Sequence, residues 1–203
     1  MNYGDITTAV LGNRFPQSSL GSAQQWINAR YAWIWTTEDW TFKRGTDDVT
    51  TTANSAFLAT DFPTDYEGCY GLCFGDDGFE LLPMRSGDFH SEFYSTSPGR
   101  PYAYVSRAGT IYLGPTPDAV YPLTLDYRKA FVPLVNSADI PAIPAAFHYT
   151  LVTGAVALGL KMLNDPTWQA TDQEFTNGID VMRQVYLEDD LSTGNTWPSD
   201  PSF

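Results

Sequence analysis

Four residues of the chain have side chains that commonly bind metals or act as nucleophiles: Cys69, Cys73, His90 and His148. A structural zinc site takes four such ligands at characteristic spacings, whereas His90 lies in a predicted loop and His148 on a predicted helix. If residues 69–74 form a strand, the two cysteines are about 13 Å apart, at about 3.3 Å per residue, which is too far for a disulfide. We therefore expect no metal site, two small buried thiols, and a partly buried His148 bonded to a carbonyl or side chain.

Acidic residues are the second kind of candidate, because carboxylates can bind calcium or hydrolyse glycosidic bonds. Asp76, Asp77 and Glu80 lack the alternating spacing of a calcium loop and are typical of a turn. A pair of carboxylates can be chosen almost anywhere among 24 Asp and Glu residues, so no particular pair is indicated. The sequence has no nucleophile-elbow, phosphate-loop, dinucleotide-binding or zinc-protease motif. We predict a protein that is not an enzyme and has no cofactor.

Aromatic residues near the end of a predicted helix suggest a third chemistry. Trp33, Trp35, Trp40 and Phe42 could together line a sugar-binding face. Packing against a core is the commoner reason for such residues on and after a helix. A small polysaccharide-binding module, or a hydrolase that uses Trp and acidic residues, is kept as the alternative function.

The charge of the chain limits its partners. Its 203 residues include 24 acidic and 11 basic side chains, which give a formal net charge of −13. Tight nucleic-acid binding and anionic membrane surfaces both require Lys and Arg, so this charge argues against either partner. The longest apolar stretch, residues 153–160, is far shorter than the roughly 20 residues of a membrane-spanning helix. The first residues also lack the features of a signal peptide, and we expect synthesis in the cytoplasm.

The elements that must position these side chains are helical at both ends of the chain. Residues 5–11 are predicted to form a short helix with Asp5 as a candidate N-cap, and residues 22–37 a longer one that begins with a capping-box pattern. After Pro144, apolar residues recur at helical spacing, and a last helix is expected over residues 166–187. The predicted apolar stripe after Pro144 consists of Phe147, Leu151, Ala155, Leu158 and Met162.

Between the helices, the sequence alternates in short runs that are broken by Gly, Pro, Asn and Asp, as in an antiparallel sheet. A hairpin turn is predicted at residues 75–78. The predicted fold class is α+β: terminal helices packed as a small helical bundle, an inserted antiparallel β region and an extended C-terminal tail. The expected parts are a helical part at residues 1–45, a β-rich insertion at 46–139, a second helical part at 140–190 and the tail at 191–203.

Three stretches, in this order, resemble the head-to-tail adaptor (connector) proteins of tailed bacteriophages. Each is structural, and their order and spacing carry the resemblance. The first is an aromatic helix with a Trp-x-Phe exit, the second a strand and a Pro-x-Pro turn followed by another strand, and the third a Pro-x-x-Phe-His helix opening. They are residues 30–35 with 39–42, residues 109–119 with 123–128, and residues 143–148 with 151–155.

The resemblance implies a structural virion protein of the head–tail neck. Such adaptors form a ring, commonly of twelve copies, that docks on the portal protein and continues the DNA channel to the next neck or tail protein. An acidic wall suits this role, because it repels phosphate and lets double-stranded DNA pass without tight binding. Another neck or tail-completion protein of a phage is the second alternative.

The last thirteen residues are predicted to bind a partner. The segment is too poor in apolar residues to fold alone, yet Leu191, Trp197 and Phe203 are spaced along it as candidate anchors. The resemblance adds that adaptor C-termini often extend along the portal. These three residues are therefore the predicted partner-binding residues.

Overall fold

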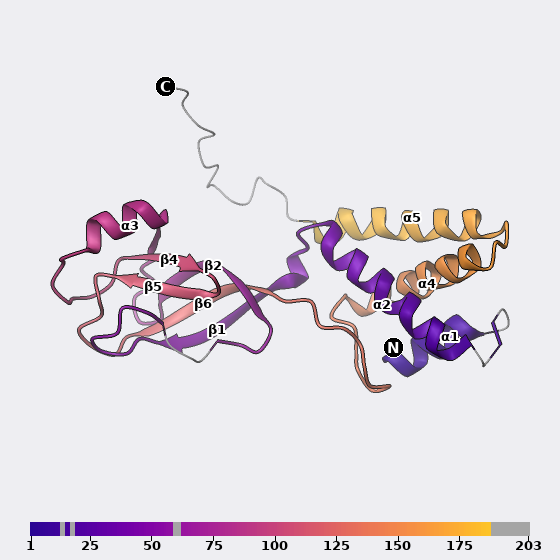
Figure 1. The fold of residues 1–203 in the computed structure, drawn as a ribbon, viewed down its shortest axis with the longest axis horizontal. Helices are drawn as coiled ribbons and strands as arrows, with labels where there is room; N and C mark the ends of the chain where they lie inside the picture. The colour runs from indigo at the N-terminus through magenta and orange to yellow at the C-terminus, as the bar shows by residue number, and fades with distance from the viewer. Residues whose placement is uncertain (13–14, 17–18, 59–61, 188–203) are drawn as a thin grey trace, which may run out of the picture. The chain divides into compact units, whose positions relative to one another are not determined.

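The structure is a computed structural model that describes residues 1–12, 15–16, 19–58 and 62–187. The chain divides into two compact units. A helical unit comprises Met1–Phe42 together with the chain from Phe131 onward, and a sheet unit comprises Lys43–Ala130. Figure 1 shows the helices and strands of each unit.

The helical unit has four α-helices in its described residues. Short 3-10 turns, η2 and η3, follow α2 and precede α4. The bounds are α1 (Tyr3–Leu11), α2 (Leu20–Thr37), η2 (Thr41–Lys43), η3 (Ala145–Phe147), α4 (His148–Met162) and α5 (Trp168–Tyr186).

Helix α1 begins earlier than predicted, and Asp5 is not its N-cap. The side chain of Asn2 accepts a hydrogen bond from the backbone N–H of Asp5 at 2.8 Å, and the Asp5 carboxylate accepts one from the N–H of Asn2 at 3.1 Å. This is a reciprocal capping box, in which Asp5 occupies the third helical position. Both residue types cap helices well, so the pattern alone did not select between them.

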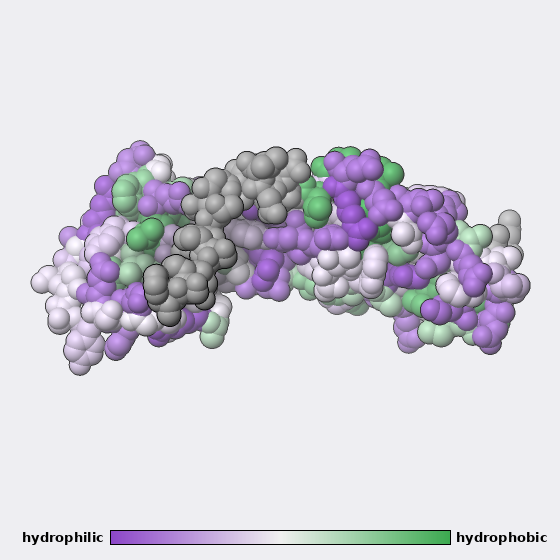
Figure 2. All heavy atoms as spheres, turned by 90° about the horizontal axis from the view of Figure 1, so that it is seen from above, coloured by the Kyte–Doolittle hydropathy of each residue, from purple (hydrophilic) through white to green (hydrophobic). Residues whose placement is uncertain are grey.

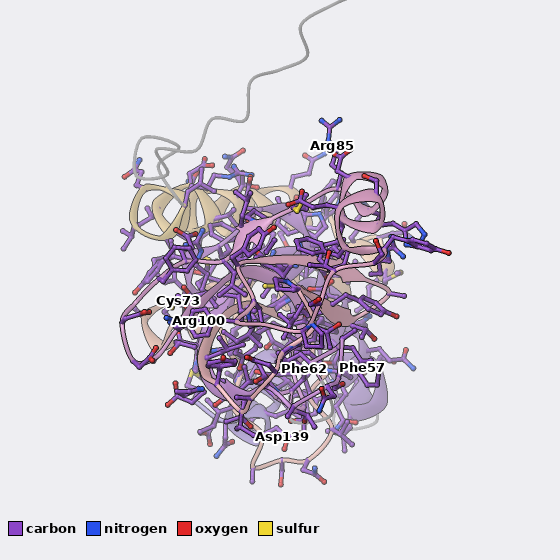
Figure 3. All side chains as sticks on the ribbon, turned by 90° about the vertical axis from the view of Figure 1, so that its left-hand side faces the viewer. Phe57, Phe62, Cys73, Arg85, Arg100 and Asp139 are labelled. Atoms are coloured by element: carbon purple, nitrogen blue, oxygen red, sulfur yellow. The ribbon has the colours of Figure 1, made fainter. Side chains whose placement is uncertain are left out.

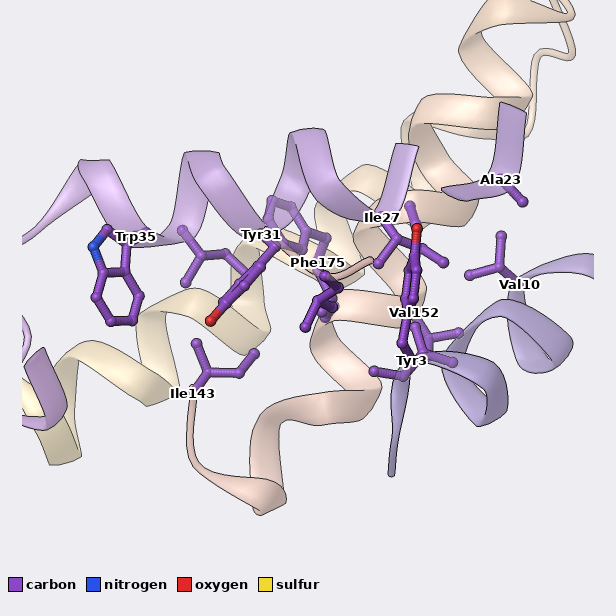
Figure 4. Packing of buried hydrophobic residues seen from close by; sticks show 14 of the residues in the cluster. Tyr3, Val10, Ala23, Ile27, Tyr31, Trp35, Ile143, Val152 and Phe175 are labelled. Atoms are coloured by element: carbon purple, nitrogen blue, oxygen red, sulfur yellow. The ribbon is translucent and has the colours of Figure 1, made fainter. Parts of the chain in front are cut away.

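Helix α4 packs against α1, α2 and α5, and two glycines let its neighbours approach closely. A Cβ atom at Gly154 would lie 2.6 Å from the ring of Phe175, and one at Gly159 would lie 2.5 Å from the ring of Trp26. Figure 4 shows the core that results, with side chains of α1, α2, α4 and α5 in contact. Glycine at these two positions of α4 therefore allows the rings of Phe175 and Trp26 to pack against the helix backbone.

Most of the apolar residues in the predicted stripes of α4 and α5 are buried in the structure, but one is exposed. Leu151, Phe175, Ile179 and Met182 are buried, as predicted. Met162 is 66% exposed at the end of α4, so the predicted apolar stripe stops one turn earlier.

The loop that leads from Phe131 to α4 adds two buried side chains to this core. Leu134 and Ile143 are buried among the helices. The backbone of Leu134 is held by the Asn28 side chain, which donates to its carbonyl and accepts from its N–H, both at 2.9 Å. These two bonds give hydrogen-bond partners to the N–H and C=O groups of a loop residue that lies among apolar side chains.

The sheet unit contains two three-stranded sheets. The first has the strand order β1-β6-β2 and is antiparallel throughout, and the second has the order β3-β4-β5. In the second sheet β4 and β5 are antiparallel, whereas the two-residue strand β3 runs parallel to β4. The bounds are β1 (Arg44–Thr50), β2 (Tyr66–Phe74), β3 (Leu82–Pro83), β4 (Ala103–Arg107), β5 (Thr110–Gly114) and β6 (Pro122–Lys129).

One helix of the sheet unit departs from the sequence prediction. Residues Ser86–Phe93 form α3, so His90 lies on a helix and not in a loop. None of the residues of α3 is buried, which explains why its sequence gave no clear apolar periodicity. With helices at both ends of the described chain and strands between them, the predicted α+β fold class is confirmed.

Candidate interaction surfaces

An exposed face of α2 carries no charge. The residues Ser22, Gln25, Ala29, Trp33 and Thr36 are exposed at helical spacing, and together they are called the α2 face. The single charged residue of the helix, Arg30, borders this face and is only partly exposed, because its side chain packs over the Phe175 ring. Its Nε donates to the carbonyl of Gly154 at 3.1 Å, and its guanidinium forms an ion pair with Asp172.

The aromatic residue of the α2 face is only half packed. Trp33 lies 5.4 Å from the ring of Phe175, centroid to centroid, and is 42% exposed. Trp33 therefore packs on the helical core, the commoner role for such a residue, and also remains partly exposed. Trp is the residue type most often found at the centre of protein interfaces.

Two of the four aromatic residues considered for a sugar-binding face cannot contact a sugar, because they are buried. Trp35 and Trp40 are buried, and the Nε1 of Trp40 donates to the carbonyl of Ile34 at 2.6 Å. Trp40 also stacks on Phe42 with ring centroids 5.7 Å apart. These side chains are part of the helical core and do not form an exposed row of aromatics.

A groove lies between α1, α4 and α5, and it is called the α4 groove. Its volume is about 320 Å³, and Ala9, Tyr149, Thr153, Val156, Thr171 and Glu174 are among the residues that line it. Tyr149 is 65% exposed, and Glu174 is the only charged residue of the lining within the part of the chain that the structure describes. The groove therefore offers a mostly uncharged surface on the helical unit.

Apolar side chains are also exposed at the C-terminal end of α5. Val181, Val185 and Leu187 define this α5 end, and all three are at least two-fifths exposed. Figure 2 views the helical unit from the side of α5 and shows hydrophobic residues at this end, among a largely hydrophilic surface. Three acidic residues, 188–190, separate the α5 end from the predicted tail in the sequence.

The carboxylates of the predicted hairpin turn bind an arginine. Arg100 is 2.6 Å from Asp77 and 3.5 Å from Asp76, and its guanidinium lies 3.9 Å above the centre of the Phe74 ring. The backbone N–H of Phe79 and then Arg100 hold the pKa of Asp77 below its usual value. Figure 3 shows where Arg100 lies in the sheet unit. It also shows Arg85, at the start of α3, projecting outward from that unit. The turn is a structural ion cluster.

The two cysteines are half-buried thiols, less buried than predicted. The Sγ of Cys69 lies 3.4 Å from the carbonyl of Gly71, and the Sγ of Cys73 lies 3.8 Å from the carbonyl of Thr124. Burial raises the pKa of the Cys69 thiol to about 11, which keeps it protonated and poorly nucleophilic. Packing accounts for both residues.

His148 is bonded to a carbonyl, as predicted, and it is more buried than predicted, with 2% of its surface exposed. Its Nε2 lies 3.1 Å from the carbonyl of Ile143, which only accepts, so Nε2 carries the proton. The charged amino group of Met1 is 2.9 Å from Nδ1 and can donate to it. Burial, with a smaller contribution from this amino group, lowers the pKa of His148 and favours the neutral ring.

We expect the stability of the helical unit to fall in mild acid because of His148. The unfolded chain binds a proton near pH 6.5 whereas the folded chain does not, so stability is lost as pH falls below that value toward the lower folded pKa. Urea unfolding between about pH 7.5 and about pH 5.5 should show this loss, and His148→Gln should reduce it. His90→Gln, in the other unit, is the control. An equal loss in both variants would contradict the assignment.

The described residues contain no metal or membrane site that can be recognised by its geometry. No group of three or more His, Cys, Asp or Glu side chains in this part of the chain is arranged to hold a metal ion. No helix within these same residues is both long and apolar enough to cross a membrane. The predicted partner-binding residues Leu191, Trp197 and Phe203 lie outside the described residues.

The sequence reasoning missed the α2 face and the α4 groove. Their signal was the scarcity of charged residues in two helices of an acidic chain. Helix α2 has one charged residue in 18, and the only basic residue of α4 apart from His148 is Lys161. Which uncharged positions face outward could be known only from the packing.

Comparison with known proteins gives the class of the molecule. The family model described as SU10 adaptor protein matches residues 1–198, which is nearly the whole chain. No curated protein matches the sequence. An α+β chain with this match is a structural adaptor protein of bacteriophages. The chain belongs to the SU10 adaptor protein family.

Proposed function

We propose that the chain is a head-to-tail adaptor of a tailed phage virion. Copies of it form a ring, of twelve in the commonest arrangement, beneath the portal protein. The ring continues the DNA channel to the next neck or tail protein. The observation that carries this proposal is the family match over residues 1–198.

The charge of the chain supports a conduit for DNA. A wall that holds DNA would slow its passage, whereas an acidic wall repels phosphate over a Debye length of about 8 Å at physiological salt. The surplus of 13 negative charges per copy is of the sign that such a channel needs. Double-stranded DNA is therefore a passing partner that the ring does not bind tightly.

The helical unit forms the body of the ring in this proposal, and the tail makes the contact with the portal. The proposed portal-binding anchors are Leu191, Trp197 and Phe203. The exposed α5 end supports this arrangement, because Val181, Val185 and Leu187 are exposed apolar side chains within a few residues of the tail in the sequence. A portal surface that binds the tail can also cover these side chains.

Ring formation should depend on the portal protein and on salt. Like charges on neighbouring copies oppose assembly, so the purified chain is expected to be monomeric at low concentration and low salt. Addition of the portal protein of the same phage, or of salt, should favour the ring. Native mass spectrometry and sedimentation velocity measure the copy number. Salt that disperses a purified ring, or a ring symmetry unrelated to that of the portal, would contradict the proposal.

A further inference from the structure

We propose that the α2 face of one copy docks into the α4 groove of the next copy in the ring. This inference rests on the proposed function, since it names the contact through which neighbouring adaptors meet. It concerns the helical unit alone. The occupant of each surface is a second copy of this chain.

Charge is the first argument for a second copy as the partner. Each chain carries a net charge of −13, so two copies repel each other least where their facing surfaces are nearly free of carboxylates. The α2 face has no charged residue, and Glu174 is the single charged residue among the described residues that line the α4 groove. By contrast, Asp165 and Asp180 are not buried, and Asp47 and Asp48 are exposed on β1. The two uncharged surfaces are where acidic copies can approach with least repulsion.

The shapes of the two surfaces form the second argument. Trp33 is 42% exposed and is the one aromatic residue of a helix face whose other members are uncharged: Ser22, Gln25, Ala29 and Thr36. The α4 groove is a depression of about 320 Å³ with apolar and hydroxyl side chains on its walls. An aromatic anchor that enters a preformed depression is the usual centre of a stable interface. The face supplies the anchor, and the groove supplies the pocket.

The positions of the two surfaces form the third argument. Gly159 of α4 lies against Trp26 of α2, whereas Thr153 of α4 lines the groove. At 100° per residue these two positions are about 120° apart around the axis of α4. The α2 face points away from the core, so the two surfaces are different and lie on different sides of the unit. A contact between unlike surfaces is heterologous, and rings are closed by contacts of this kind.

A single added carboxylate tests the α2 face. Ala29→Glu places a negative charge on the face at an exposed position, and Gln169→Glu adds the same charge at an exposed position of α5 outside both surfaces and far along the helix from the α5 end. Both variants should keep the thermal unfolding midpoint of the wild type. Ala29→Glu should raise the concentration needed for half-maximal ring assembly on the portal at least about tenfold, whereas Gln169→Glu should change it less than about threefold. Equal assembly by the two variants would overturn the inference.

A compensating charge tests the groove as the partner of the face. Tyr149→Lys alone should weaken assembly, because it removes an exposed ring from the groove and adds a cation that must lose water. Combined with Ala29→Glu in one chain, it should restore most of the assembly, because every contact then pairs Glu with Lys. A double variant as defective as Ala29→Glu would exclude the groove as the partner.

The proposed function can fail separately from this inference. A wild-type chain that forms no ring with the portal protein, at low salt or at about 1 M salt where the Debye length is about 3 Å, would count against both. If the wild type and every variant form rings equally well, the proposed contact is wrong and the adaptor role still stands.

Discussion

A chain that ends at Leu191 is expected to fold as the full chain does but to lose nearly all binding to the portal protein. The core of the helical unit consists of residues up to Tyr186, so removal of residues 192–203 should leave the thermal unfolding midpoint nearly unchanged. The deleted segment contains Trp197 and Phe203, two of the three proposed anchors. Short segments that bind in extended form gain affinity from a few apolar side chains in pockets of the partner.

Substitution separates the anchors from the length of the tail. Replacement of Leu191, Trp197 and Phe203 by Ser should weaken capture on immobilised portal protein nearly as much as the truncation. Replacement of Ser192, Asn195 and Ser199 by Ala should leave it within about threefold of the wild type, because these side chains are not proposed to enter pockets. Equal capture of the full-length and truncated chains would move the portal contact to the helical body, with the α5 end as the first candidate.

Helix prediction succeeded where apolar spacing and a start signal agreed. The stripe through Leu151 and the proline at Pro144 gave α4, which the structure places at His148–Met162 after a 3-10 turn. Prediction failed at α3, because an eight-residue helix with no buried residue has no apolar stripe to reveal it. The parallel pairing of β3 with β4 joins residues about twenty positions apart, a contact that local patterns do not encode.

Surface prediction was limited by a different cause. The sequence shows that α2 is rich in aromatics, but aromatic residues on several faces leave the direction of the core undefined. Ile34 and Trp35 are buried and the adjacent Trp33 is 42% exposed, a difference that depends on how α4 and α5 pack against α2. The tail anchors were predicted from composition alone. To predict the α2 face, one must know which side chains of α2 are buried in the core, and the sequence alone does not show this.

Replacement of Leu151 by Ala is expected to destabilise the helical unit by about 2–5 kcal/mol. Leu151 is fully buried on α4, in the cluster that also holds Ile27, Phe175 and Met182. The substitution removes apolar contacts and leaves a cavity in a close-packed region where glycines already bring the helices together. Neighbouring side chains cannot easily fill that space, so the loss should lie well above that of an exposed substitution.

The tryptophans make this loss measurable in one unit. All six lie outside residues 43–130, so Trp fluorescence in a urea titration follows the helical unit and not the sheet unit. Met162→Ala, on the same helix at a side chain that is 66% exposed, is the matched control and should stay within about 0.5 kcal/mol of the wild type. A shift of the midpoint with an unchanged slope identifies a change in stability and not in compactness. A loss below about 0.5 kcal/mol for Leu151→Ala would mean that α4 is not the packed centre of the helical unit, and the proposed body of the ring would then lack its core.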